Sequence, residues 1–460
     1  MRGIKLIALV MTASACLSCG NMSKHEQSRR AIGEALKTPK VWQDIETETA
    51  ATPENWLEGF NDPILFALIE EAKSKNIDLK ISAKNIEKAW LLAAGAGVDL
   101  KPKVDIAVGK TQYGVSIDSY NKSFGYIDTG MSMQLELDVW GRIREGAEAA
   151  KMNAQVAEAD YAFAQQSLSA TIAKTYLKII EAKQQMVISH KNRANLEETL
   201  RITRVKYENG LSSVQDVALN SANLAAVDDQ LLSLKGAERD SVRALELLLG
   251  RYPGASIAVA SVLPTLPAPP VAGLPSELLE RRPDIIAAER SVVAAFHRSA
   301  EAKAAFLPRV VLSDRIASGS EHLSGLFDPG LYVWKLAGTL LIPIFDGGRR
   351  KINSQLATVE QEQATLNYTR VALDAFFEVE NNLYHGKVLA DREVMLGEVS
   401  HQSAIAHQIS EIRYIEGEVE LLDMLAIQRE AISAESTLLG VKRARLDQQI
   451  DLYLSLGGNW

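Results

Sequence analysis

The sequence predicts a mostly α-helical, internally duplicated protein with a small β part. Three observations indicate this fold class. A signature of the form basic-Tyr-x-x-Gly-x5-Asp occurs at residues 206–216 and again at 413–423, 207 residues apart in a chain of 460. Long segments without proline flank each copy, and two pairs of segments alternate apolar and polar residues. A repeat in this fixed order indicates two copies of one structural unit rather than three independent domains.

The composition excludes several functional classes. Hydrophobic residues make up 47% and charged residues 23%, as in ordinary folded proteins, while aromatic residues reach only 6%. The net charge of -8 does not favour a nucleic acid partner. Both cysteines, Cys16 and Cys19, lie near the N-terminus, and none of the seven histidines forms an HExxH pair. We therefore expect no catalytic residue, no metal site and no cofactor.

The N-terminus has the pattern of an export signal. A basic segment at residues 1–5 precedes a short apolar core at 6–11, which is too short to span a membrane. Small residues before a cysteine are typical of bacterial lipoprotein signals. Cys16 has the better residues before it, whereas Cys19 is followed by Gly20 and leaves a longer apolar core. We favour lipidation of Cys19, with Cys16 as the alternative; an ordinary cleaved signal is a third interpretation.

The first repeat is expected at residues 63–250, after a lipoprotein signal at 1–18 and a polar, loop-like N-terminal tether at 19–62. Pro63 suits the first turn of a helix that continues to about Ala96. Val104, Ile106 and Val108 alternate with other residues, as in a strand. The predicted elements that follow this first helix are a β-hairpin at 102–139, a long helix at 142–208, a tip at 209–213 and a return helix at 214–249. A 67-residue helix would be about 100 Å long.

A linker separates the repeats, because residues 251–275 contain six of the fourteen prolines. The second repeat is expected at 276–460. Its predicted elements are a helix, a β-hairpin at 308–345 with strands at 309–318 and 332–345, a long helix at 349–415, a tip at 416–418 and a return helix at 419–456. Leu425, Ile432, Leu439, Leu446 and Tyr453 are spaced by sevens, which predicts a left-handed supercoil with a neighbouring helix.

Four strands cannot close a barrel, and lipid does not tolerate an open sheet edge. No stretch approaches 18 consecutive apolar residues, so no helix is expected to span a membrane. If the exported chain enters a membrane, it must therefore combine its strands with those of other copies. Three copies would supply twelve strands, and a barrel of that size leaves an aqueous lumen.

Several motifs carry a resemblance to a known family. They are the duplicated tip signatures, Phe60–Pro63, Leu137–Arg144 at the end of the second strand, and Pro343–Gly348 in the second half. These motifs occur in an order that is similar to that of the TolC-like outer-membrane efflux channels, in their lipoprotein-bearing branch. The resemblance extends from about residue 42 to the C-terminus. The resemblance implies a lipid-anchored homotrimer in the Gram-negative outer membrane. It also implies a twelve-stranded β-barrel and a periplasmic α-barrel, whose tips dock onto a periplasmic adaptor and an inner-membrane pump.

The resemblance also assigns roles to tip residues. Asp423 falls where the family places an acidic ring that narrows the periplasmic entrance. Tyr414 and Asp216 match positions whose hydrogen bonds help to hold the entrance closed. Val419 stands where some members carry an arginine, and Ala426 replaces a second acidic residue. The closed state is therefore expected to be weaker, or to depend on other residues.

Each of these acidic and aromatic residues also has a simpler interpretation. Asp216 and Asp423 could cap or solvate the return helices, and Tyr207 and Tyr414 could be packing residues that seal the turns. We favour a gating or ring role for Asp423 over the same role for Asp216.

The other tip residues form two pairs. Gly210 and Gly417 are expected to be left-handed helix terminators that place an adaptor-facing surface. Lys206 and Arg413 lie where they complement helix C-termini, although a solvated charge is the simpler interpretation of both.

The sequence thus favours a passive trimeric export duct of a tripartite efflux system, and no enzyme. A periplasmic coiled-coil scaffolding lipoprotein is the alternative from another class, but it does not explain the alternating strands. Within the channel class, a type I protein secretion duct is a further alternative. Neither the cargo, whether drug, metal ion or polypeptide, nor the partner pump follows from the residues.

Overall fold

The computed structural model describes residues 23–43, 56–117, 120–268, 270, 272–322, 324, 328, 330 and 332–458. The predicted signal, with Cys16 and Cys19, lies outside them. The chain forms two compact units. The first comprises Met1–Lys37, Lys84–Ala159 and Ile286–Val371, and the second comprises Thr38–Ala83, Asp160–Ile285 and Ala372–Trp460. Each unit contains segments from both predicted repeats, so neither repeat is a compact body by itself.

The expected loop-like tether is wrong in two places. Helix α2 (Lys24–Ala35) and the 3-10 helix η1 (Trp56–Phe60) both lie in the segment expected to be loop. The side chain of Ser23 accepts a hydrogen bond from the backbone N–H of Glu26 at 3.2 Å and caps α2. This cap favours a helix even though the segment is polar.

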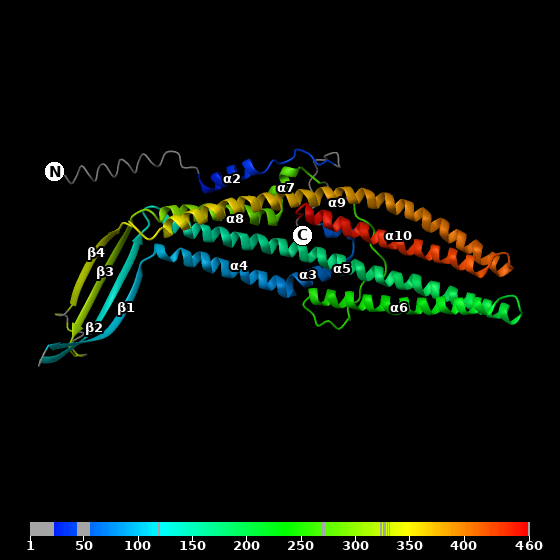
Figure 1. The fold of residues 1–460 in the computed structure, drawn as a ribbon, viewed down its shortest axis with the longest axis horizontal. Helices are drawn as coiled ribbons and strands as arrows, with labels where there is room; N and C mark the ends of the chain where they lie inside the picture. The colour runs from blue at the N-terminus through cyan, green and yellow to red at the C-terminus, as the bar shows by residue number, and fades with distance from the viewer. Residues whose placement is uncertain are drawn as a thin grey trace. The chain divides into compact units, whose positions relative to one another are not determined.

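The first unit contains one antiparallel sheet in the order β1-β2-β3-β4 (Figure 1). Its strands are β1 (Lys103–Ile117), β2 (Tyr120–Leu137), β3 (Arg309–Ser320) and β4 (Tyr332–Leu341). The register sets one apolar row across all four strands, namely Ile106, Met131, Ile316 and Trp334. These side chains are exposed, by 74% in Ile106 and Trp334. The sheet therefore has one largely apolar face that nothing in its own strands covers.

The last strand ends earlier than predicted. β4 stops at Leu341, whereas the alternation suggested a strand as far as residue 345. Pro343 has no backbone N–H to donate to a sheet and is disfavoured inside a ladder.

Each long helix begins with a carboxylate that caps it. At α5 (Arg142–Glu208), the side chain of Asp138 accepts from the backbone N–H groups of Ile143 and Arg144 at 3.1 and 3.0 Å. At α9 (Arg349–Glu416), Asp346 accepts from the N–H groups of Gly348 and Arg350, both at 3.1 Å. The first unit also holds most of α4 (Ile77–Ala96), nearly all of α8 (Pro283–Ala304) and the short η2 (Val98–Leu100).

The helix predicted from residue 63 to 96 is in fact two helices, α3 (Pro63–Lys75) and α4. Asn76 makes the break. Its Oδ1 accepts from the N–H of Leu79 at 2.8 Å, which starts α4, and its Nδ2 donates to the carbonyl of Leu248 at 2.8 Å. The prediction of one continuous helix was wrong because this second contact joins residues 172 positions apart.

The second unit contains α3, the later parts of α5 and α9, α6 (Val214–Leu248), α7 (Pro275–Arg281) and α10 (Leu421–Ser455). Its main core is built on α5, where Ile172, Tyr176 and Ile180 are fully buried. The hydroxyl of Tyr176 donates to Asp62 at 2.7 Å, and Asp62 also caps α3. The Phe60–Pro63 motif is thereby tied to the core.

Among the described residues, no helix has an apolar stretch long enough to cross a bilayer.

Candidate functional site

The first tip turns at Gly210, where the chain passes from α5 to α6. Gly210 has a φ of 72°, in the left-handed region that favours glycine. The N–H of Leu211 donates to the carbonyl of Lys206 at 2.8 Å, and the N–H of Gly210 donates to that of Tyr207 at 3.0 Å. This pair of bonds is the Schellman ending of a helix, which satisfies carbonyls that the helix leaves free.

The second tip, between α9 and α10, has the same backbone. Gly417 has a φ of 83°. The N–H of Glu418 donates to the carbonyl of Arg413 at 2.9 Å, and the N–H of Gly417 to that of Tyr414 at 3.2 Å. Both signatures therefore produce the same turn, and differences between the tips must come from side chains.

In the first tip, Asp216 belongs to a capping box. Its carboxylate accepts from the N–H of Ser213 at 2.9 Å and from the hydroxyls of Ser213 and Ser212 at 2.8 and 2.9 Å. The Ser213 hydroxyl in turn accepts from the N–H of Asp216 at 3.1 Å. The Ser213 N–H lowers the pKa of Asp216, and both hydroxyls add to this effect against an opposing contribution from burial. The Asp216 carboxylate is thus fully occupied by hydrogen bonds at the start of α6.

In the second tip, the equivalent Asp423 is free of such bonds. It lies exposed in the first turn of α10, where the cap residue Glu420 makes no side-chain capping bond. No described residue forms a hydrogen bond or an ion pair with its carboxylate. Asp423 therefore presents an available negative charge at the tip, whereas Asp216 does not.

The two signature tyrosines also differ. Tyr414 is only 5% exposed and packs with Leu421 and Met424, whereas Tyr207 is 47% exposed. The hydroxyls of Tyr414 and Thr203 lie 2.9 Å apart. Burial raises the pKa of Tyr414, the bond to Thr203 opposes this, and nearby Asp216 adds to it. Tyr414 thus joins the second tip to α5 of the first.

Lys206 completes this joint. Its Nζ donates to the backbone carbonyl of Tyr414 at 2.5 Å and lies 4.0 Å from the centre of the Tyr414 ring. Both contacts favour a cation there. Arg413, its equivalent, instead forms an exposed ion pair with Glu418 at 3.0 Å. The bond from Lys206 crosses to the other tip, whereas the ion pair of Arg413 stays within its own turn.

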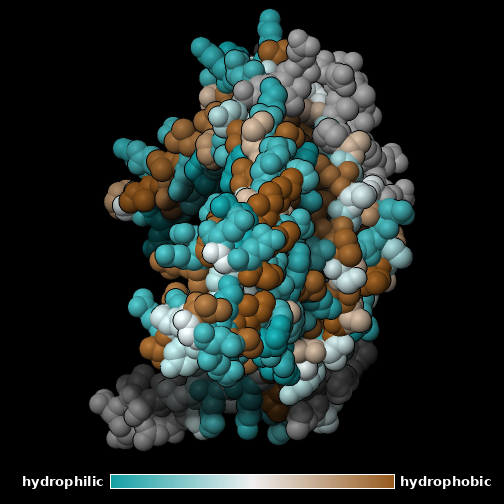
Figure 2. Space-filling view, turned by 90° about the vertical axis from the view of Figure 1, so that its right-hand side faces the viewer, coloured by the Kyte–Doolittle hydropathy of each residue, from teal (hydrophilic) through white to brown (hydrophobic). Residues whose placement is uncertain are grey.

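Figure 2 looks onto the side of the molecule where these hairpin ends lie, and it shows hydrophobic and hydrophilic patches intermixed. The exposed apolar side chains of the two tips are Tyr207, Leu211, Val214, Ile415 and Leu422. Such a mixed surface is of the kind found at protein–protein contacts that form and separate.

Sequence reasoning missed two residues of this site. The spacing of Thr203 from Leu200 and Tyr207 fits a coiled-coil seam, but nothing local indicated its contact with Tyr414, which lies 211 residues away. Ser213 did give one: a serine three residues before an acidic residue is a capping pattern. The equivalent position in the second repeat is Glu420, which breaks that pattern.

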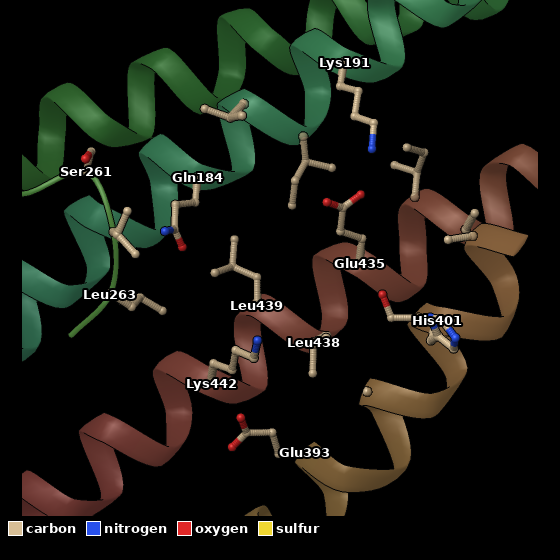
Figure 3. A pocket seen from close by; sticks show the side chains of 18 of the residues that line it. Gln184, Lys191, Ser261, Leu263, Glu393, His401, Glu435, Leu438, Leu439 and Lys442 are labelled. Carbon is tan, nitrogen blue, oxygen red and sulfur yellow. The ribbon is translucent and has the colours of Figure 1, made fainter. Parts of the chain in front are cut away.

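The second unit also holds an open cavity of about 1240 Å³, lined by α5, α9, α10 and residues 261–266 of the linker (Figure 3). Charged side chains of both signs line it, including Lys191, Glu435 and Lys442. Burial lowers the pKa of His407 on its wall. In the described part of the chain, no three His, Cys, Asp or Glu side chains are placed to hold a metal ion.

The duplicated helical hairpins, the four-stranded sheet and the paired tips define an outer-membrane efflux channel protein. The family model described as outer membrane efflux protein matches residues 68–251 and 274–458, so the chain belongs to this family.

Particular relatives cover nearly the whole chain. It is 30% identical to the pyoverdine export outer membrane protein OpmQ of Pseudomonas putida, over 92% of this chain and 93% of that protein. It is 28% identical to the cation efflux system protein CusC of Escherichia coli, over 88% of each. The solved outer-membrane channel OprN superposes with a TM-score of 0.84 at 27% identity, covering 92% of this chain and 98% of that one. The predicted family, fold class and outer-membrane location are confirmed.

Proposed function

We propose that the chain forms a passive homotrimeric export duct of a tripartite efflux system. The observation that carries this proposal is the sheet. Among the described residues, its outer strands β1 and β4 each leave an edge unpaired, and one face is apolar and exposed. Open edges are not stable in lipid, whereas a closed barrel satisfies every backbone group. Pooling the strands of three copies closes the sheet and turns the apolar face to lipid. The duct itself catalyses no reaction.

The tips are the proposed periplasmic end of this duct. Gly210 and Gly417 turn the helices there, and the exposed side chains around them would meet a periplasmic adaptor beneath an inner-membrane pump. Tyr207, exposed on the first tip, belongs to this contact surface, as does Arg413 on the second. Energy for transport would come from the pump, and opening from rotation or splaying of the tip helices.

Asp423 is the proposed constriction of the periplasmic entrance. Three copies of an exposed, unpaired carboxylate around one axis would repel one another, bind cations and set ion selectivity. Asp216 and Tyr414 take supporting roles, because both are engaged in bonds within the chain. The different contacts of the two tips support this division.

A lipid chain on Cys19, with Cys16 as the alternative, is the proposed additional anchor. One chain binds a membrane only marginally, so the barrel would carry most of the attachment. The cargo is proposed to depend on the partner pump, since the relatives include a pyoverdine exporter and a cation efflux protein. Purifying the pump that accompanies this chain would identify the cargo class.

Membrane fractionation and reconstitution test the proposal. The full chain should sediment with outer membranes and migrate in SDS as a trimer that heating converts to monomer. It should also conduct ions in planar bilayers. Extraction as a soluble monomer, with no conductance, would instead favour the scaffolding lipoprotein.

A further inference from the structure

The polar face of the sheet carries a row of four side chains that the strand register sets side by side. Asp105 pairs with Ser132, Ser132 with Arg315, and Arg315 with Lys335. Directly opposed side chains in an antiparallel pair lie about 5 Å apart at Cβ. The register therefore places the two cations, Arg315 and Lys335, next to each other on neighbouring strands.

Like charges directly opposite each other destabilise a sheet unless something compensates them. Arg315 has a partner, because its guanidinium lies 3.7 Å from the carboxylate of Asp128. Asp105 is likewise engaged, at 3.4 Å from Lys103. Among the described residues, no carboxylate lies within ion-pair distance of Lys335. Within one copy, the row thus keeps one uncompensated positive charge beside a second cation.

Most of the nearest neighbours on the same face are small. One adjacent row aligns Ala107, Gly130 and Ala317 with Val333, and the other aligns Lys103 and Gln134 with Ser313 and Ala337. Space above Gly130 is already limited, since a Cβ there would lie 3.1 Å from that of Ala317. Arg315 and Lys335 are both exposed, and their side chains are longer than those of Ser313, Ala317 and Ala337 beside them.

We propose that Arg315 and Lys335 form an oxyanion-binding station on the wall of the duct. The inference rests on the proposed trimeric function, in which the polar face of the sheet lines the lumen. A guanidinium binds carboxylate and phosphate oxygens through its planar fork, and an ammonium adds a compact charge. Three copies would make a cationic ring about 20 Å along the strands from the start of β3, since each residue advances about 3.3 Å.

This ring would have the opposite charge to the ring proposed at Asp423. A cargo bearing a carboxylate or a phosphate would be held in the strand region after passing the tip. Nothing in the apolar row on the other face could do this, because alternation places Trp334 on the lipid side and Lys335 on the lumen side.

Block of single-channel current by inorganic phosphate tests the station. Phosphate added on the strand side should reduce the current of the reconstituted full chain. The double substitution Arg315→Ala/Lys335→Ala should raise the half-blocking concentration about tenfold, as expected when charge-assisted hydrogen bonds are lost. Lys335→Arg should keep the block, and Thr339→Ala, on the same face, is the matched control.

The outcomes separate this inference from the proposed function. A wild-type chain that never conducts would contradict the duct itself. Normal conductance with equal phosphate block in the wild type and the double variant would overturn the station alone. Heat-modifiable trimers in SDS establish that each variant has folded before it is compared.

Discussion

The two tips share a signature and a backbone, yet their side chains make different contacts. In the first tip, Asp216 is bound within a capping box and Tyr207 is exposed. In the second tip, Asp423 is unbound among the described residues and Tyr414 is buried against Thr203. The two turns have the same backbone, and the contacts around them determine which acid and which aromatic ring are exposed.

The difference between the acids comes from two positions, Ser212 and Ser213 in the first tip, whose counterparts in the second are Val419 and Glu420. Ser213 supplies the hydroxyl that closes the capping box of the first tip, and its counterpart Glu420 cannot close one. A repeated motif therefore does not imply a repeated role, because a neighbour outside the motif can engage one of its residues.

Removing the buried tyrosine should have the largest effect. Tyr414→Ala leaves a cavity and the unpaired hydroxyl of Thr203, and comparable aromatic truncations cost about 3–5 kcal/mol. Tyr207→Ala, on the exposed equivalent, should cost no more than about 0.5 kcal/mol. Hydrogen exchange of the amides in residues 410–425 should report local opening for the first variant only. Equal exchange in both variants would contradict the asymmetry of the tips.

Replacing the basic residues should also destabilise one tip more than the other, but by less than the tyrosine substitutions. Lys206→Met removes a charged hydrogen bond and a cation–π contact to Tyr414, which together contribute about 1–3 kcal/mol. Arg413→Met removes an exposed ion pair that contributes at most about 1 kcal/mol. Exchange in residues 410–418 should rise more in the first variant. A larger rise on replacing Arg413 would show that Lys206 does not join the tips.

Glu420→Ser converts the second tip toward the first. The new hydroxyl, three residues before Asp423, completes the capping pattern and should stabilise the first turn of α10 by about 0.5–1 kcal/mol. It should also engage the carboxylate of Asp423 and weaken cation block of the channel. Exchange and conductance measured on the same preparation check both results. If the first turn of α10 became more stable but cation block did not change, the proposal that Asp423 forms the constriction would be contradicted.

The capping box should respond to acid. The folded pKa of Asp216 lies below its ordinary value of 3.8. Its stabilising contribution is therefore complete above that value and is lost as pH falls through the lower, folded one. The amides in the first turn of α6 should stay protected from hydrogen exchange down to about pH 4 and lose protection below it. Exchange rates corrected for the intrinsic effect of pH would measure this. Asp216→Asn should remove this dependence; a loss of protection beginning near pH 6 would contradict it.

Much of the architecture could be predicted from local patterns. The absence of proline predicted the long helices, Gly210 and Gly417 marked where they turn, and alternation marked the strands. What could not be predicted depends on distant partners. Asn76 breaks a helix where it reaches Leu248, and Tyr414 is buried in a cluster that includes Leu196 of α5.

The residues of the candidate site could be predicted from the sequence, but the different contacts of the two tips could be predicted only in part. Tyr207 and Tyr414 occupy the same position in the same motif, so no local pattern separates them. The acids were different: Ser213 and Glu420 already distinguished Asp216 from Asp423 in the sequence. The roles proposed for these residues, and the boundaries of the repeats, stay predictions.

Cation block of the reconstituted channel tests the division of roles most directly. Asp423→Asn and Asp216→Asn each remove one negative charge per copy from matched positions of the two tips. We expect Asp423→Asn to change single-channel conductance and to raise the half-blocking concentration of a divalent cation about tenfold or more. Asp216→Asn should leave the cation block near the wild-type value. Unaltered currents in Asp423→Asn, or an equal change in both variants, would contradict the account.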